Sequence, residues 1–254
     1  MQQAADKFPV TRHSVIAALQ GEDPARRSHA LEAITAAYWK PIYKHLRLRW
    51  ELGVDDAQDL TQEFFLRLIE KDILAGYDAG KGRLRTYLRT CADRLFLNQS
   101  RDARRIKRGG EAALLNLDFE TAERELTQAS SSEADGVEQR FEREWLRSLF
   151  ALAIERVQQQ YRVARKLVPL ALFERYDLAE HEGSRPTYSE MAEEFQVSVS
   201  DVTNYLAAAR RDFRQCVLDQ LRDMTATEEE FRAEARVLFG GLAIRRGLIP
   251  GARK

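Results

Sequence analysis

The chain of 254 residues lacks the features that mark secreted and membrane proteins. Only two cysteines occur, Cys91 and Cys216, and both fall within helical patterns, so no disulfide framework is expected. No apolar run approaches the roughly 20 residues that cross a bilayer. The first residues, MQQAADKFPVTRHS, lack the apolar core of a signal peptide. We therefore expect a cytoplasmic protein.

Proline, valine and isoleucine are also scarce, and this scarcity favours helices. The chain has six prolines, and Ala, Leu, Arg, Glu and Gln dominate its composition. Asp23-Pro24 has the pattern of an N-cap followed by the first helical residue, and Pro41 is expected to interrupt and kink the helix that starts there. We predict an all-α fold with helices over 11–20, 24–50, 55–71, 81–108, 140–162, 165–179, 188–195, 200–216 and 227–239.

Charge is balanced over the whole chain but unevenly distributed along it. Residues 81–108 carry ten Lys/Arg against two Asp, whereas residues 115–139 carry seven Asp/Glu against one Arg. This segregation indicates a polyanion-binding face. Tyr77, Tyr87 and Phe96 lie within or beside the basic run, which favours single-stranded nucleic acid because bases stack on aromatic rings while phosphates pair with arginine. A solvated run of charge is the simpler alternative.

Two adjacent predicted helices, 188–195 and 200–216, have the spacing of a helix-turn-helix. Thr187 and Ser200 are the expected N-caps, and the residues expected to pack the pair are Ala192, Val197, Val202 and Leu206. In this motif the second helix enters the major groove, and its early residues reach base edges. The residues in position to contact bases or phosphates are Ser200, Thr203, Asn204, Tyr205, Arg210 and Arg211. An ordinary helical hairpin is the alternative.

Four carboxylates gather near the start of the 55–71 helix: Asp55, Asp56, Asp59 and Glu63. Acidic residues four apart share a helix face, as a metal site requires, but no histidine lies nearby. Asp55 and Asp56 are better explained as helix-start residues that the helix dipole favours. We predict a buried stripe of Leu60, Phe64 and Leu68 on this helix, and we interpret Asp59, Glu63 and Arg67 as an exposed protein-docking stripe beside it. We expect no metal, no cofactor and no catalytic residue.

Three segments in this order resemble sigma-70 family RNA polymerase sigma factors of the extracytoplasmic-function (ECF) group. They are DDAQDLTQEFFLRLIE, KGRLRTYLRTCADRLFLNQSRDARR and, after an acidic stretch, YSEMAEEFQVSVSDVTNYLAAARRDFR. The resemblance covers most of residues 28–222. It implies two small helical domains: a sigma domain 2-like bundle over 28–110 and a sigma domain 4-like helix-turn-helix over 140–222. An acidic linker, 111–139, would join them, with an N-terminal helical extension at 1–27 and a C-terminal extension at 223–254.

The resemblance implies a transcription initiation factor that binds core RNA polymerase, recognises the minus-10 and minus-35 promoter elements and helps to melt the DNA. Docking on the clamp coiled coil of the largest polymerase subunit would use Asp59, Gln62, Glu63 and Arg67. The minus-10 strand would be held by Tyr77, Arg83, Arg85, Arg89, Asn98, Arg101 and Arg105. The minus-35 element would be read by the six residues given above for the second helix. Thr203, Asn204 and Tyr205 stand where the family usually has Lys and Arg, which predicts weak or unusual minus-35 reading. An anti-sigma factor or other regulator is a further candidate partner.

Two other functions stay open on the sequence. A helix-turn-helix regulator that does not bind core polymerase would explain residues 188–216, but it would leave the basic helix and the docking stripe without a role. A nucleic-acid enzyme built on the acidic cluster would depend on a divalent metal, and Asp59→Ala would abolish its cleavage.

Overall fold

The computed structural model describes residues 18, 23–70, 73–102, 115–128, 136–179, 184–225 and 227–242, and every regular element within them is helical. The all-α prediction is confirmed for this part of the chain, while the helix expected at 11–20 lies outside it except for Ala18. In chain order the elements are α2 (Pro24–Arg49), α3 (Val54–Glu70), η1 (Ile73–Gly76), η2 (Ala79–Lys81), α4 (Leu84–Asp102), α5 (Phe119–Gln128), α6 (Val137–Val163), α7 (Leu167–Phe173), η3 (Glu174–Leu178), α8 (Tyr188–Phe195), α9 (Val199–Asp223) and α10 (Glu228–Leu242).

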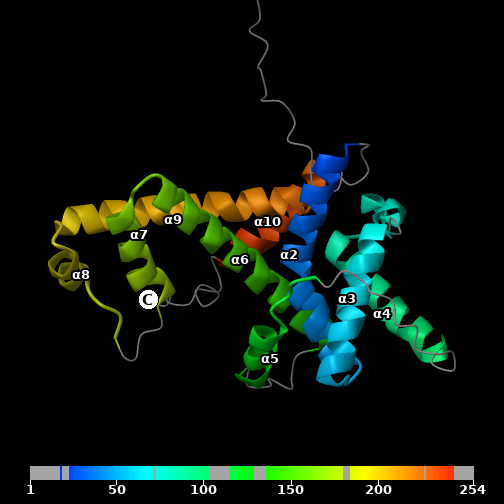
Figure 1. The fold of residues 1–254 in the computed structure, drawn as a ribbon. Coiled ribbons are helices and arrows are strands. Elements are labelled where there is room, and N and C mark those ends of the chain that lie inside the picture. Colours follow the sequence, from blue (N-terminus) through cyan, green and yellow to red (C-terminus); the bar gives the residue numbers. More distant parts are fainter. Residues whose placement is uncertain are drawn as a thin grey trace, which may run out of the picture.

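Two groups of helices are joined by a long diagonal one (Figure 1). α2, α3 and α4 form one group, and α7, α8 and α9 form the other. α6 runs between the groups and packs against both α2 and α9, and α10 packs on α9. None of the helices in the described ranges combines the length and the apolar character that crossing a membrane requires.

α2 begins where the sequence predicts but does not break where it predicts. Asp23 Oδ1 accepts hydrogen bonds from the backbone N–H groups of Ala25 (3.0 Å) and Arg26 (3.3 Å), with Pro24 in the first turn. The predicted interruption at Pro41 is wrong, because the helix continues through it to Arg49. Proline removes one backbone hydrogen bond, but the apolar residues around it bury their side chains almost completely, which offsets that loss. These residues are Ile34, Tyr38, Ile42 and Leu46.

The apolar stripes of α3 and α4 face α2 as the periodicity predicts. Leu60, Phe64 and Leu68 of α3 are at most 3% exposed, which confirms the predicted buried stripe. On α4, Leu84, Leu88 and Leu95 are buried at three- and four-residue steps, whereas Cys91 is only half-buried. The local hydrophobic pattern therefore accounts for this three-helix group.

α6 packs against helices of both regions that the sequence analysis predicts as separate domains. Trp145 of α6 stacks on Tyr38 of α2 with ring centroids 6.5 Å apart, and Phe150 lies 6.0 Å from Phe213 of α9. A single buried cluster extends from Ala30 in α2 to Leu238 in α10. The predicted two-domain arrangement is therefore not confirmed, since the described residues of 28–110 and 140–222 share one core.

α5 is a helix inside the stretch that the sequence analysis interprets as a linker. Its Phe119 and Ala122 are buried, and the Phe119 ring lies 5.7 Å from Trp39 and 4.9 Å from Tyr43, both on α2. Burying one such aromatic side chain contributes about 2 kcal/mol. Acidic residues surround this short apolar face and obscure it in the sequence, so the linker interpretation is not confirmed for residues 119–128.

Carboxylates of α5 pair with the basic residues of α2. Glu123 accepts hydrogen bonds from Tyr43 Oη (2.6 Å) and Arg47 Nε (2.9 Å). Glu125 accepts from Lys40 Nζ (2.7 Å) and Lys44 Nζ (2.6 Å). Burial opposes ionisation of Glu125, but the two ammonium groups outweigh it and lower the pKa of its carboxyl group. The acidic stretch thus neutralises basic residues of the same chain.

Glu125→Gln is expected to lower the free energy of unfolding by about 1 kcal/mol at pH 7, because the pair is partly exposed and solvent screens it. The stabilisation by Glu125 is present above its usual pKa of 4.5 and is lost as pH falls through the lower folded-state pKa. Urea unfolding monitored by tryptophan fluorescence at pH 7 and below pH 4 checks this. The difference between variant and wild type should vanish at the lower pH, and a difference that persists there would contradict the assignment.

Candidate nucleic-acid interface

The first turn of the basic helix α4 carries an arginine that points into the protein. Arg85 is 5% exposed, and its Nε donates a hydrogen bond to Glu142 of α6 at 2.6 Å. Its Nη1 lies 2.8 Å from a carboxylate oxygen of Glu234 on α10. The guanidinium carbon is 4.6 Å from the centre of the Trp145 ring. Arg85 therefore joins three helices that are distant in sequence.

The charge of Arg85 is well compensated where it lies. Burial by itself would lower the pKa of the guanidinium, but the hydrogen bonds to Glu142 and Glu234 outweigh it and raise that pKa. Removing one partner of such a buried pair typically costs about 3 kcal/mol, since the other charge stays behind without compensation. In this conformation Arg85 has the surroundings of a structural residue.

Three more residues predicted to hold the minus-10 strand also face protein partners. Arg83 Nε lies 2.8 Å from Glu234, and Arg89 Nη2 donates to Glu138 of α6 at 2.7 Å. Tyr77 is 6% exposed, with its Oη 3.1 Å from the carbonyl oxygen of Gly82 and 3.3 Å from Glu230 of α10. Together with Arg85, these residues hold α4 against α6 and α10, so they are occupied in this structure.

The aromatic residues beside the basic run are packed as well. Phe96 stacks on Trp50 with centroids 4.4 Å apart, and Tyr87 Oη donates to the carbonyl oxygen of Ile73 at 2.6 Å. Burial is the main cause that raises the pKa of Tyr87 to about 12. The stacking surface that the sequence predicts for exposed bases is therefore turned toward protein in this conformation.

The second half of α4 presents a different surface. Arg94 and Asn98 are exposed, and Leu97 between them is 40% exposed. Arg101 lies in the last turn of α4, but its side chain and the whole of Arg105 lie outside the described residues. Of the predicted minus-10 residues that the structure describes, Arg83 and Asn98 are exposed, and Arg83 is also paired with Glu234.

The predicted docking stripe on α3 is only partly exposed. Asp59 is exposed, and Gln62 and Arg67 are half-buried. Glu63 accepts a hydrogen bond from the Gln99 amide of α4 and forms an ion pair with Arg67 one turn along α3. Glu63 thus links α3 to α4, while Asp59 has the more accessible carboxylate.

α8 and α9 form the predicted helix pair, with one cap displaced. Thr187 and Glu190 form a capping box at the start of α8, as expected. α9 is capped by Ser198 instead of the predicted Ser200: Ser198 Oγ accepts from the Asp201 N–H at 3.0 Å. The Ser-x-x-Asp pattern at 198–201 was the signal that could have located this cap. Leu172, Met191, Val202 and Leu206 bury the interface between the helices.

The turn between α8 and α9 is built on a residue other than glycine. Gln196 is in the left-handed region, with φ of 53°. The N–H of Val197 donates to the Ala192 carbonyl oxygen at 3.0 Å and that of Gln196 to Glu193 at 3.3 Å, which is the Schellman pattern. The backbone there has the conformation that glycine adopts most easily.

The residues predicted for minus-35 reading divide into two groups. Ser200, Thr203, Asn204 and Arg211 are exposed, so the start of α9 is accessible. Tyr205 is half-buried against the small core under α8. Arg210 donates from Nε to Asp177 at 2.8 Å and from Nη2 at 3.0 Å. These hydrogen bonds, acting against burial, raise the pKa of Arg210.

Asp177, which is 6% exposed in the π-helical turn η3, was missed at the level of the sequence. Its Oδ1 also accepts from Arg185 Nη2 at 3.1 Å. Glu142 and Glu234 were missed in the same way. An acidic residue on an amphipathic helix normally faces solvent, so no local pattern distinguishes one that binds an arginine elsewhere in the chain.

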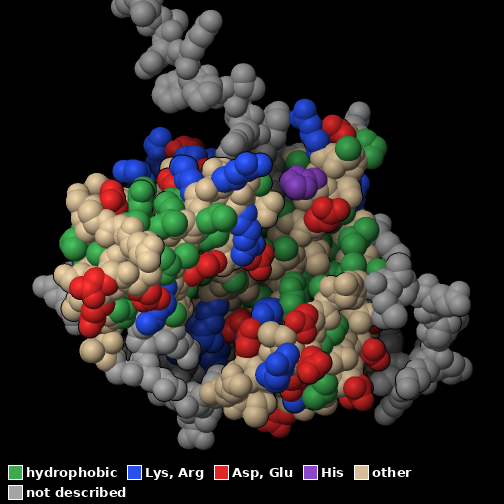
Figure 2. Space-filling view, turned by 60° about the vertical axis from the view of Figure 1, so that its left-hand side comes forward, with side chains coloured by type: hydrophobic (Ala, Val, Ile, Leu, Met, Phe, Trp, Pro, Cys, Tyr) green, Lys and Arg blue, Asp and Glu red, His purple; other side chains and the backbone are tan. Residues whose placement is uncertain are grey.

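Charge on the surface is mixed. Figure 2, which brings forward the left-hand side of Figure 1, shows Lys/Arg and Asp/Glu side chains interspersed, with neither sign covering the whole face. Within the described ranges, no group of three or more His, Cys, Asp or Glu side chains is arranged to hold a metal ion.

Comparison with known families adds one finding. Residues 38–106 match the family model for sigma-70 region 2, a segment that covers the second half of α2, all of α3 and all of α4. The match supports a sigma-70 family member. Sigma factors act in transcription initiation and are not enzymes, and their region 2 binds core RNA polymerase and promoter DNA. No curated protein and no solved structure matches the chain.

Gln196→Gly is expected to raise the free energy of unfolding by about 0.5–1 kcal/mol, because glycine adopts the left-handed conformation without steric cost. The same substitution at Gln159, an exposed position inside α6, is the matched control and should lower stability by about 1 kcal/mol. Denaturant unfolding of both variants checks the prediction. A destabilised Gln196→Gly protein would contradict the backbone conformation of this turn.

Proposed function

We propose that this chain is a transcription initiation factor of the extracytoplasmic-function group, which brings core RNA polymerase to a promoter and helps to open it. The match of residues 38–106 to sigma-70 region 2 carries the proposal. Two features of the matched helices support it: a polar stripe on α3 in which Asp59 is exposed, and a basic helix α4 on which Arg94 and Asn98 are exposed. The accessible start of α9 adds a candidate surface for reading duplex DNA.

Core polymerase would dock on α3 through Asp59, Gln62, Glu63 and Arg67. Asp59 is the residue of this set with an exposed carboxylate, so it is the one best placed to pair with a basic group of the clamp coiled coil. Glu63 and Arg67 would present a pair that is already ordered, because Gln99 and the ion pair between them hold the two side chains in place. Such preorganisation lowers the entropy lost on binding.

The minus-10 strand would be contacted first along the exposed half of α4, by Arg94 and Asn98 and, further along, by Arg101 and Arg105. Four other predicted residues are bonded to carboxylates of α6 and α10: Tyr77, Arg83, Arg85 and Arg89. They would contact the strand only if these bonds to α6 and α10 were broken. In the free protein these four act as positioning residues.

The minus-35 element would be read by Ser200, Thr203 and Asn204, with Arg211 meeting a phosphate. These three are short and neutral, so they donate and accept single hydrogen bonds and lack the bidentate contact that arginine makes with guanine. Arg210 would serve mainly to hold α9 on Asp177. Weak sequence reading by this helix follows from that composition.

The central experiment adds the purified chain to core polymerase on a library of randomised promoter sequences and maps the 5′ ends of the transcripts. Transcripts that start at defined sites, and only when the chain is present, are the expected result. Absence of both core binding and new start sites would falsify the proposal. Sequence-specific DNA binding without any affinity for core polymerase would favour the alternative of an independent helix-turn-helix regulator.

Asp59→Arg is expected to weaken the affinity for core polymerase by about tenfold, because it replaces an attractive contact by a repulsive one. The matched control is Glu155→Arg on the exposed side of α6, which reverses the same charge away from α3. Titration of labelled protein with core polymerase measures both. Equal affinities for the two variants would show that α3 is not the docking surface.

Arg94→Ala combined with Asn98→Ala is expected to reduce promoter opening at least tenfold while leaving the unfolding transition unchanged, since both side chains are exposed. Arg85→Gln should instead lower the free energy of unfolding by about 3 kcal/mol, because Glu142 and Glu234 lose their buried partner. Permanganate footprinting on a selected promoter and urea unfolding separate the two effects. Unaltered opening by the double variant would exclude this half of α4 from the DNA contact.

A further inference from the structure

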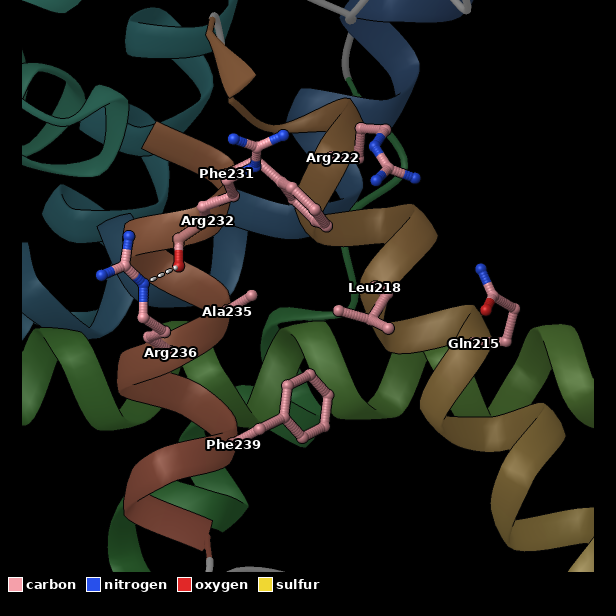
Figure 3. A pocket seen from close by; sticks show the side chains of 8 residues that line it. All are labelled: Gln215, Leu218, Arg222, Phe231, Arg232, Ala235, Arg236 and Phe239. Atoms are coloured by element: carbon pink, nitrogen blue, oxygen red, sulfur yellow. Dashed lines mark hydrogen bonds between the residues drawn. The ribbon is translucent and has the colours of Figure 1, made fainter. Parts of the chain in front are cut away.

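A groove lies between α9 and α10, in the part of the chain that neither the family model nor the proposed promoter contacts include. It is open, has a volume of about 650 Å³, and is lined by Gln215, Leu218, Arg222, Phe231, Arg232, Ala235, Arg236 and Phe239. Figure 3 shows Leu218 directed from α9 toward α10, with Ala235 and the rings of Phe231 and Phe239 on the α10 side. The floor of this groove is therefore apolar.

Arginines surround this floor. Arg222 on α9 stands over the Phe231 ring, with the guanidinium carbon 4.1 Å from the ring centre. Arg232 and Arg236 lie one turn apart on α10. Arg214, just outside the lining, lies 5.2 Å from the centre of the Phe239 ring. The lining contains three arginines and no carboxylate.

The three arginines that form the rim of the groove, Arg222, Arg232 and Arg236, have N–H donors available for a ligand. Arg232 Nε pairs with Glu228 on the same helix at 3.1 Å, and both side chains are at least half exposed, so water screens that pair. Arg236 Nε donates to the backbone carbonyl oxygen of Arg232 at 3.2 Å. Each guanidinium has five N–H donors, so most of them remain directed outward. A ligand that brings carboxylates along both edges of the groove would pair with them.

The occupant must satisfy the apolar floor and the basic rim together. A nucleic-acid backbone would pair with the arginines but would leave Leu218 and Phe239 without an apolar partner. A helix with an apolar stripe at i, i+3 or i+4, and i+7 fills such a floor, and carboxylates beside the stripe reach both edges. The lining residues on α10 run from Phe231 to Phe239, about 12 Å along the helix axis, which matches about two turns of a bound helix.

We propose that the groove between α9 and α10 binds an acidic amphipathic helix of a protein partner. The apolar face of that helix lies on Leu218, Phe231 and Phe239, and its carboxylates pair with Arg222, Arg232 and Arg236. The site does not depend on the proposed promoter contacts, because none of its residues belongs to them.

The groove also lies on the helix that holds α4. Glu234 of α10 is 4% exposed and contacts Arg83 and Arg85, whereas Ala235 beside it lines the groove. One face of α10 therefore bonds α4 and an adjacent face receives the ligand. A partner seated in the groove contacts the same helix that holds Arg83 and Arg85 through Glu234.

The test uses the full chain and a fluorescein-labelled 16-residue peptide with leucines at i, i+4, i+7 and i+11 and glutamates beside them. Fluorescence anisotropy should show saturable binding. Two control peptides have every glutamate replaced by lysine, or every leucine by serine, and each should bind at least tenfold more weakly, since a tenfold change corresponds to about 1.4 kcal/mol. Equal binding of the lysine peptide would overturn the proposal.

Two variants place the binding in the groove. Ala235→Trp fills the floor of the groove without removing a contact, and Arg236→Glu reverses an exposed charge at its edge. Each variant should lower the affinity for the acidic peptide at least tenfold. Arg162→Glu, an exposed arginine near the end of α6, is the matched control and should leave the affinity unchanged. Circular dichroism of each variant verifies that the helices are intact.

Other occupants give distinct results. A 20-base-pair DNA duplex is tested as a competitor of the acidic peptide. If the duplex displaces the peptide, and Arg236→Glu weakens the binding of both equally, the groove binds nucleic acid. A concentration-dependent dimer that Ala235→Trp dissociates, seen by light scattering, would assign it to a second copy of this chain. Either result would overturn the proposed partner class, and neither would bear on core polymerase binding through α3.

Discussion

The arrangement of the helices depends on the contacts of one buried group, the guanidinium of Arg85. The guanidinium lies over Trp145, donates a hydrogen bond to Glu142 of α6 and contacts Glu234 of α10. One side chain of α4 therefore connects α4, α6 and α10, which are far apart in the sequence. A buried charge is tolerated only when its partners are fixed around it. The apolar contact of Tyr38 with Trp145 brings α6 to α2, and the carboxylates then determine how α4 sits against them.

The same constraint explains how a neutral chain carries a strongly basic helix. Part of the positive charge of α4 is neutralised by acidic residues that come later in the chain: Glu138, Glu142 and Glu234. α5 repeats the pattern on α2, where Glu125 bonds Lys40 and Lys44. Charge that looks segregated along the sequence is thus interleaved in space. Asp59 on α3, Arg94 and Asn98 on α4, the start of α9 and the groove between α9 and α10 all stay accessible.

Local rules predicted most of the helices; the docking role of the α3 stripe stays a prediction. The Asp23 and Thr187 caps and the stripe of Leu60, Phe64 and Leu68 follow from residues a few positions apart. The same rules misplaced the α9 cap and predicted a break at Pro41. They also missed α5, whose apolar face consists of little more than Phe119 and Ala122. In the candidate nucleic-acid site, the basic character of α4 was predictable but the orientation of Arg83, Arg85 and Arg89 was not.

The sequence by itself therefore determined most of the helical segments and which of their faces are apolar, because these depend on contacts within one or two turns. Only the tertiary structure decided which charged residues meet. Arg85 and Glu142 are 57 positions apart, and Arg210 and Asp177 are 33 apart. An arginine that faces solvent and one that faces a distant carboxylate look alike in sequence, since the difference lies in the packing of other helices. That packing leaves Arg94 and Asn98 exposed and places Arg85 inside the protein.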